Sequence, residues 1–157
     1  MTVARRTDAA AIIAGVALIV LPLVGLFFKI FWPGWYLFFL LFASPVLLVG
    51  YALQIVIAVT GFLTPRAVFR TSPARARALA AAWIGAVGIA LTGLFFVDGG
   101  DTTYGSAFMY LIGADGDAGV STVSTLISFA TGAAWIGGWV WLVIEWIVAL
   151  VRRRRAR

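Results

Sequence analysis

The chain of 157 residues contains no cysteine and no histidine. Without cysteine it cannot form disulfides, use a catalytic thiolate or hold an iron–sulfur cluster. Without histidine it lacks the ligand of imidazole-bound haem and of the usual zinc sites, and the commonest acid–base catalyst. We therefore expect no cofactor and no catalytic site of these kinds.

Charge is also scarce. Charged residues make up 11% of the chain and hydrophobic residues 63%, and the mean hydropathy is +1.06. Soluble globular proteins are about half apolar and about one-quarter charged, so a soluble fold is excluded. The pattern predicts one all-α membrane domain over residues 1–157, with four transmembrane helices at about 9–31, 35–63, 78–97 and 128–151.

The connections between these spans differ in charge. Residues 64–77 hold four arginines, whereas residues 98–127 hold four aspartates and no lysine or arginine. The middle of the acidic loop, residues 104–112, is apolar enough to form a short outer helix or a re-entrant segment. Pro22 and Pro45 lie inside the first two spans, where each ring removes a backbone hydrogen bond and predicts a kink.

The distribution of positive charge predicts the orientation. Eleven arginines lie before the first span, in loop 64–77 or in the basic tail 152–157, and Lys29 is the one cation on the other side. The positive-inside rule therefore places both termini in the cytoplasm and the acidic loop outside a cell membrane. This placement accounts for the net charge of +6 without nucleic acid, and the arginine-rich composition suggests a bacterial source. Lys29 is expected to extend to the outer boundary of the bilayer.

Small residues form stripes on the last two spans. Such stripes let helix backbones approach closely, which matters in lipid, where no hydrophobic effect drives helices together. We expect the third and fourth spans to form the closest pair; the alternative is a groove for a lipid or quinone. The stripe on the third span is Ala81, Gly85, Gly88 and Thr92, and the stripe on the fourth is Thr131, Ala134, Gly138 and Glu145, of which Ala134 and Gly138 are the expected packing residues.

A faint internal repeat links the two halves. Residues 25–28 and 93–96 share the sequence Gly-Leu-Phe-Phe at an offset of 68, and residues 42–44 resemble 129–131 at an offset of 87. Duplication of a two-helix hairpin, with both copies inserted in the same orientation, would produce this pattern. Chance similarity between apolar segments would also produce it.

Two strongly polar residues lie inside predicted spans. Gln54 and Glu145 are both about five residues to the cytoplasmic side of their midpoints, so we expect them to share a hydrogen bond, with Arg77 or Arg75 supplying positive charge. Ionisable residues at such depth are functional candidates by default. The alternative is therefore that Glu145 carries protons or contacts a substrate.

The remaining charged groups give two further hypotheses. The four loop acids, Asp98, Asp101, Asp115 and Asp117, could supply oxygen ligands to a hard cation such as Ca²⁺, or could simply be solvated. The tail arginines, each contributing about 1 kcal/mol near an anionic surface, could bind lipid headgroups. They are Arg152, Arg153, Arg154, Arg155 and Arg157.

The sequence favours a non-enzymatic role, as an accessory or structural subunit that packs against other membrane proteins or against further copies of itself. One alternative is a small oligomeric transporter or lipid carrier that uses Gln54 and Glu145. Another is an enzyme that acts on lipid headgroups through the loop aspartates.

Overall fold

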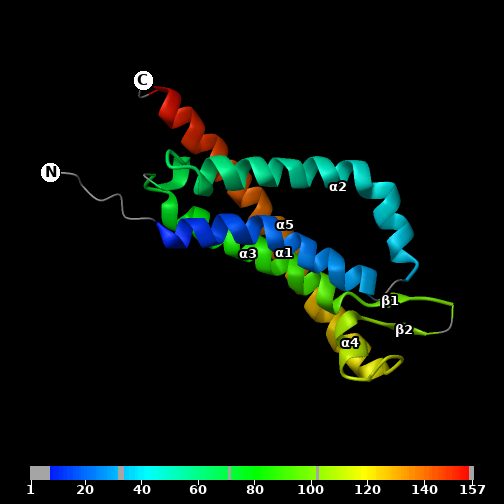
Figure 1. Ribbon diagram of the computed structural model, residues 1–157. Coiled ribbons are helices and arrows are strands. Elements are labelled where there is room, and N and C mark those ends of the chain that lie inside the picture. The colour runs from blue at the N-terminus through cyan, green and yellow to red at the C-terminus, as the bar shows by residue number, and fades with distance from the viewer. Residues whose placement is uncertain (1–7, 32–33, 71, 102, 156–157) are drawn as a thin grey trace.

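The computed structural model describes residues 8–31, 34–70, 72–101 and 103–155. Within them the chain forms four long helices, α1 (Ala9–Phe31), α2 (Tyr36–Ala58), α3 (Arg75–Phe95) and α5 (Ala118–Arg155) (Figure 1). A π-helix, η1 (Val59–Leu63), continues α2. All four helices are long and apolar enough to cross a membrane. The protein is therefore a multi-pass, all-α membrane protein, as the hydropathy predicts.

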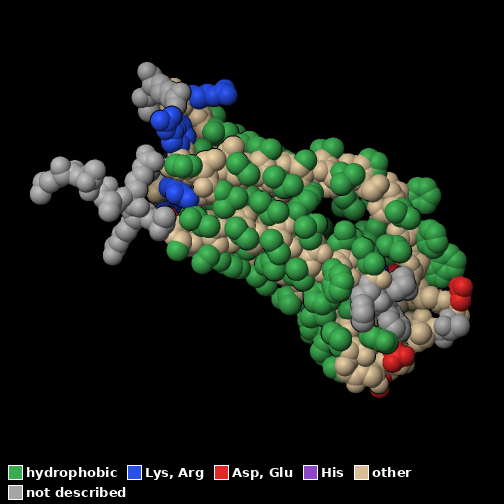
Figure 2. Space-filling model, viewed as in Figure 1, with side chains coloured by type: hydrophobic (Ala, Val, Ile, Leu, Met, Phe, Trp, Pro, Cys, Tyr) green, Lys and Arg blue, Asp and Glu red, His purple; other side chains and the backbone are tan. Residues whose placement is uncertain are grey.

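Short elements connect the helices, and the two ends of the molecule carry opposite charge. A 3₁₀ turn, η2 (Val68–Arg70), lies between η1 and α3, and the strands β1 (Asp98–Gly99) and β2 (Tyr104–Gly105) pair antiparallel between α3 and the short helix α4 (Ala107–Leu111). The described arginines of residues 66–70, 75–77 and 152–155 form the arginine end, and the aspartates of residues 98–101 and 115–117 form the aspartate end (Figure 2). Figure 2 shows the basic side chains at one end and the acidic ones at the other.

Two helices begin several residues before the spans that hydropathy predicts. The hydropathy predicts the third span from residue 78, but α3 begins at Arg75, and it predicts the fourth from residue 128, but α5 begins at Ala118. The start of α5 follows Asp117, whose Oδ1 accepts a hydrogen bond from the amide of Val120 at 2.8 Å. Side-chain capping rather than hydropathy sets this start, so the acidic connection ends at residue 117.

The short helix α4 lies inside the segment 104–112, for which the sequence predicts a helix or a re-entrant segment. Ser106 precedes it, and the Ser106 hydroxyl oxygen accepts a hydrogen bond from the amide of Met109 at 3.2 Å. Ala107 and Met109 are buried. The helix thus packs against the long helices at the aspartate end, where the rings of Phe95 and Phe108 lie 4.7 Å apart.

Helices α3 and α5 form the most extensive pair, as the glycine spacing predicts. A Cβ atom added to Gly138 would lie 2.7 Å from the amide nitrogen of Gly85, and one added to Gly88 would lie 2.8 Å from the amide nitrogen of Trp135. Both distances are too short for any side chain, so the helices meet backbone against backbone at two successive levels.

One residue of the predicted interface is misplaced. The side chain of Ala134 is exposed, whereas Thr131, another member of the predicted stripe, lies beside α3 together with Trp135. Thr92, the last residue of the α3 stripe, lies with its hydroxyl oxygen 3.1 Å from that of Thr131. At this level the interface therefore combines small residues with an interhelical polar contact.

Helices α1 and α3 run parallel and also meet at glycines (Figure 1). A Cβ atom on Gly93 would collide with the carbonyl oxygen of Gly25, and one on Gly25 would lie 2.7 Å from the carbonyl oxygen of Ile89. Gly25 and Gly93 are the matching positions of the sequence repeat. Helix α3 therefore lies between α1 and α5 and contacts each through its backbone.

Helix α2 stands apart from the other three over most of its length (Figure 1). Residues 36–53 include no buried side chain, whereas Gln54, Ile57 and Ala58 near its end are buried. The helix bends in its first part, which holds Pro45, since proline removes one backbone hydrogen bond. The packed core therefore extends towards the arginine end, where the rings of Phe62 and Phe69 lie 5.0 Å apart.

Candidate functional site

The acid inside the membrane-spanning region is paired with an arginine. Arg77, in the first turn of α3, donates from Nε to Glu145 Oε1 at 2.6 Å and from Nη2 to Oε2 at 3.4 Å. Trp141, one turn before Glu145 on α5, donates weakly to the same carboxylate at 3.4 Å. The glutamate side chain is 11% exposed and the arginine side chain 56%. Arg77 thus supplies the positive charge that the sequence analysis expects opposite Glu145.

The predicted hydrogen bond between Gln54 and Glu145 is wrong. Gln54 is buried and donates from Nε2 to the backbone carbonyl of Leu18 at 2.6 Å. Pro22, four residues after Leu18, has no amide hydrogen, so the carbonyl of Leu18 lacks its regular helical donor. A carbonyl without a donor is costly in an apolar environment, and Gln54 satisfies it. Gln54 therefore has a structural role at the proline of α1.

Tyr51 makes a second contact of this kind. The Tyr51 hydroxyl donates to the carbonyl oxygen of Ile19 at 2.8 Å. Because Tyr51 and Gln54 lie on one face of α2, the two contacts fasten the middle of α2 to the proline-containing part of α1. The sequence signal for this attachment is Pro22, which predicts an unpaired carbonyl. Depth counting, which places polar residues by counting from the midpoints of the spans, does not consider such a carbonyl.

Asp98 organises the aspartate end. Lys29 Nζ lies 2.6 Å from Asp98 Oδ2, and both side chains are less than 10% exposed. The carboxylate also accepts the amide of Tyr36, the first residue of α2, at 3.0 Å. The ammonium group of Lys29 thus has a carboxylate partner where α1 ends beside Asp98.

The ammonium group of Lys29 depends on this one anion. Among the described residues Nζ has no hydrogen-bond partner of good geometry, so the Coulomb attraction of Asp98 is its main stabilisation. The ring of Phe96, with its centroid 5.2 Å from Nζ, adds a cation–π contact. Asp98 thus joins the ends of α1, α2 and α3.

The four aspartates considered as metal ligands have separate surroundings. Asp98 is paired with Lys29, and Asp117 caps α5. Asp101 and Asp115 are exposed. The described part of the chain contains no group of three or more acidic side chains close enough to hold a metal ion.

An ion pair that the sequence analysis does not anticipate joins α1 to α3 at the arginine end. Arg75 donates from Nη2 to Asp8 Oδ1 at 2.7 Å and from Nε to Oδ2 at 3.0 Å. Asp8 also accepts the amide of Ala11 at 3.3 Å and so caps α1. The guanidinium of Arg75 holds the pKa of Asp8 below its ordinary value, and partial burial opposes this shift.

The tail arginines continue α5 and do not form a separate tail. Arg152, Arg153, Arg154 and Arg155 are helical and exposed. Arg157, like Arg5 and Arg6 before α1, lies outside the described residues. Arg153 donates from Nη1 to the carbonyl oxygen of Arg66 at 3.0 Å, so the end of α5 is tied to the loop that precedes α3.

Comparisons of this chain with protein-family models, with curated proteins and with solved structures find no match.

Proposed function

We propose that this protein is a non-enzymatic subunit of a larger membrane assembly. The observation that carries the proposal is the position of α2, whose residues 36–53 form an apolar helix with no buried side chain. Phe38, Phe39 and Phe42 on this stretch are 56%, 65% and 86% exposed. Their rings offer a large surface for helices of another protein or of a second copy.

A second uncovered surface lies on α5. Ala130, Ala134 and Gly137 share one exposed helix face, and a Cβ atom added to Gly137 would have no neighbouring atom within 4 Å. Small residues on a lipid-facing surface allow another helix to approach closely. Ala134, which the sequence analysis assigns to the contact with α3, therefore supports contact with a partner instead.

The alternative function is a small oligomeric transporter or lipid carrier with Gln54 and Glu145 along the path. The contacts of these residues weigh against it, because Gln54 is committed to Leu18 and Glu145 to Arg77. An enzyme acting on lipid headgroups through the loop aspartates has less support still, since Asp98 and Asp117 already stabilise helix ends.

The proposed setting is a bacterial cell membrane, with both termini and the arginine end on the cytoplasmic side and α4 outside. The separation of charges between the two ends of the molecule supports this orientation (Figure 2). A reporter that is active only in the cytoplasm, fused after Arg157 or inserted within residues 115–118, tests it. We expect activity only from the first fusion, and activity from the second would contradict the orientation.

Purification from membranes in a mild detergent tests the subunit role. We expect other membrane proteins to co-purify, or a defined homo-oligomer to form. Replacing Phe38, Phe39 and Phe42 together by alanine should release the partner, whereas replacing Ile13 and Val16 on the exposed face of α1 should not. A monomer without partners, or equal effects of both sets of changes, would refute the role.

Glu145→Gln separates the subunit from the transporter. For a subunit, the change removes one ion pair and should leave the purified assembly intact. For a transporter, the assembly should form but lose transport measured in vesicles. Loss of transport in an intact assembly would therefore contradict the proposal.

A further inference from the structure

A pocket of about 250 Å³ opens at the arginine end between the loop before α3 and the last turns of α5. Three arginines and one hydroxyl group line it, namely Arg66, Arg152, Arg153 and Ser72. Val68 and Ala149, both buried, form part of an apolar floor. The pocket thus combines basic groups with apolar surface where two membrane-spanning helices end.

The positive charge of this pocket is not neutralised by the acids that the structure describes nearby. Asp8 is bound to Arg75 and Glu145 to Arg77. None of the three lining arginines forms an ion pair among the described residues, although Arg152 also interacts with the Glu145 carboxylate at longer range. Their summed positive charge attracts an anion that enters the pocket.

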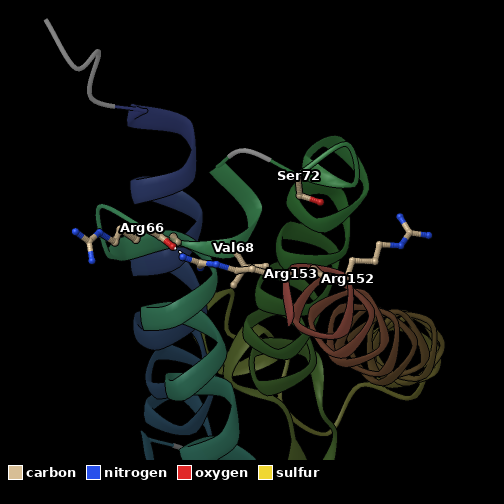
Figure 3. A pocket seen from close by; sticks show the side chains of 7 residues that line it. Arg66, Val68, Ser72, Arg152 and Arg153 are labelled. Carbon is tan, nitrogen blue, oxygen red and sulfur yellow. Dashed lines mark hydrogen bonds between the residues drawn. The ribbon is translucent and has the colours of Figure 1, made fainter. Parts of the chain in front are cut away.

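Figure 3 shows how the basic side chains lie. Arg153 extends across to the loop, where its Nη1 donates to the carbonyl oxygen of Arg66 at 3.0 Å. The side chains of Arg66 and Arg152 point away from each other on opposite sides. Both are exposed, so each can rotate towards an anion that enters between them.

Ser72 contributes a hydroxyl to the same pocket. Its oxygen accepts the amide of Ala74 at 3.1 Å, which leaves its proton available for another acceptor. Arginine and hydroxyl donors together suit the oxygen atoms of a phosphate group. The apolar floor, in contrast, suits the glycerol and upper acyl carbons that accompany a lipid phosphate.

We propose that this pocket binds the phosphate group of an anionic phospholipid. Arg153 holds the phosphate from one side, Arg66 and Arg152 close over it, and the glycerol lies against Val68 and Ala149. The inference relies on the proposed position of the arginine end at the membrane surface but not on the subunit role. Binding measured in detergent tests it without a partner protein.

The experiment counts bound lipids by native mass spectrometry of the full chain in a neutral detergent. Dioleoylphosphatidylglycerol is titrated, with dioleoylphosphatidylcholine and inorganic phosphate in parallel. We expect one phosphatidylglycerol to bind before any phosphatidylcholine, because the choline cation cancels the charge of its phosphate. Inorganic phosphate should not displace the lipid at equal concentration, and displacement would show that the ligand is free phosphate and overturn the lipid assignment.

Two double variants with the same loss of charge locate the site. Arg66→Gln with Arg153→Gln removes two lining guanidinium groups, and Arg154→Gln with Arg155→Gln removes two that do not line the pocket. At about fivefold per arginine, the first double should weaken phosphatidylglycerol binding roughly 25-fold. The second should change it less than about threefold. Equal losses would indicate diffuse attraction to the basic surface and overturn the proposal.

A single substitution of a neutral residue tests the site if the variant with Arg66→Gln and Arg153→Gln does not purify as a folded protein. Ser72→Ala removes one donor without changing the charge, and we expect binding to weaken roughly fivefold, as for one neutral hydrogen bond. Unchanged binding by this variant, or equal binding of the two lipids by the natural chain, would refute a specific phosphate site.

Discussion

The contact between Gln54 and Leu18 gives the sharpest test of the fold. Gln54 satisfies a carbonyl that Pro22 has deprived of its helical donor. Replacing Gln54 by methionine keeps the side-chain length but removes the donor. The loss in free energy of unfolding caused by this replacement should therefore depend on whether residue 22 is proline.

The expected magnitudes follow from the burial of this contact. Interhelical hydrogen bonds in membranes contribute about 0.6 kcal/mol on average and up to about 1.7, and a buried acceptor without a donor costs about 1–3 kcal/mol. With Pro22 present, Gln54→Met should therefore lower the free energy of unfolding by about 1–2 kcal/mol. In a Pro22→Ala background, the new amide at residue 22 can bond the carbonyl of Leu18, so the same change should cost less than about 0.6 kcal/mol.

The assay is reversible unfolding in mixed micelles with increasing dodecyl sulfate, followed by the fluorescence of the seven tryptophans. The natural chain, Pro22→Ala, Gln54→Met and the variant with both changes form a double-mutant cycle. Pro22→Ala also straightens the helix, but this effect is present in both proteins of the Pro22→Ala background and therefore cancels. Tyr51→Phe is the control, because Ile19 is followed four residues later by Leu23, which has an amide. Equal cost of Gln54→Met in both backgrounds would refute the link between Gln54 and the proline.

Three further predictions follow. Gly138→Ala should destabilise the protein by about 1–3 kcal/mol relative to Gly137→Ala in the same assay. The Cβ atom at residue 138 would need about 0.7 Å more space, while that at residue 137 meets open space. Equal effects would show that the close contact between α3 and α5 does not stabilise the protein. Lys29→Met should cost about 3 kcal/mol or more by leaving a buried carboxylate unpaired, and adding Asp98→Asn should restore most of the loss; no recovery would contradict the pairing. The pKa of Asp8 is lowered from 3.8 by its arginine partner, so the ion pair stabilises the folded protein above that pH and stops doing so as pH falls below it. Asp8→Asn should therefore reduce the decline in melting temperature between about pH 5 and pH 3. An unchanged decline would contradict the contribution of Asp8 to the pH dependence.

The sequence predicts the long helices well because each is a continuous apolar run. It also predicts the contact between α3 and α5, since small residues spaced at three and four positions leave a groove wherever the helix lies. Helix ends are predicted less well. The start of α5 depends on a hydrogen bond from Val120 to Asp117, and a hydropathy profile is insensitive to such a bond.

The hydrogen-bond and ion-pair partners of the polar side chains cannot be predicted by depth counting alone. Depth counting puts Gln54 and Glu145 at one level, but a level does not tell which face of a helix a side chain occupies. It also does not predict the ion pair of Lys29 with Asp98, because Asp98 is 69 positions later in the chain. Pro22 is the one available signal, because a proline in a helix always leaves one carbonyl in need of a donor.

The first hairpin carries larger side chains than the second at two positions that the repeat offsets match. At offsets of 68 and 87, Gly85 and Gly138, which touch in the structure, correspond to Ala17 and Tyr51. A phenol ring at the second position prevents the close approach that two glycines allow. Tyr51 instead reaches α1 through its hydroxyl, which bonds the carbonyl of Ile19.

The matching residues of α1 and α2 are also larger or more exposed at the next level of the interface between α3 and α5. Gly88, which accommodates the backbone of Trp135, corresponds to Val20, and Trp135 corresponds to Leu48. Val20 and Leu48 are 45% and 64% exposed, so these side chains do not form the equivalent contact. The first hairpin therefore lacks the small residues that close the second. As a result, α2 does not close against α1, and its residues 36–53 include no buried side chain.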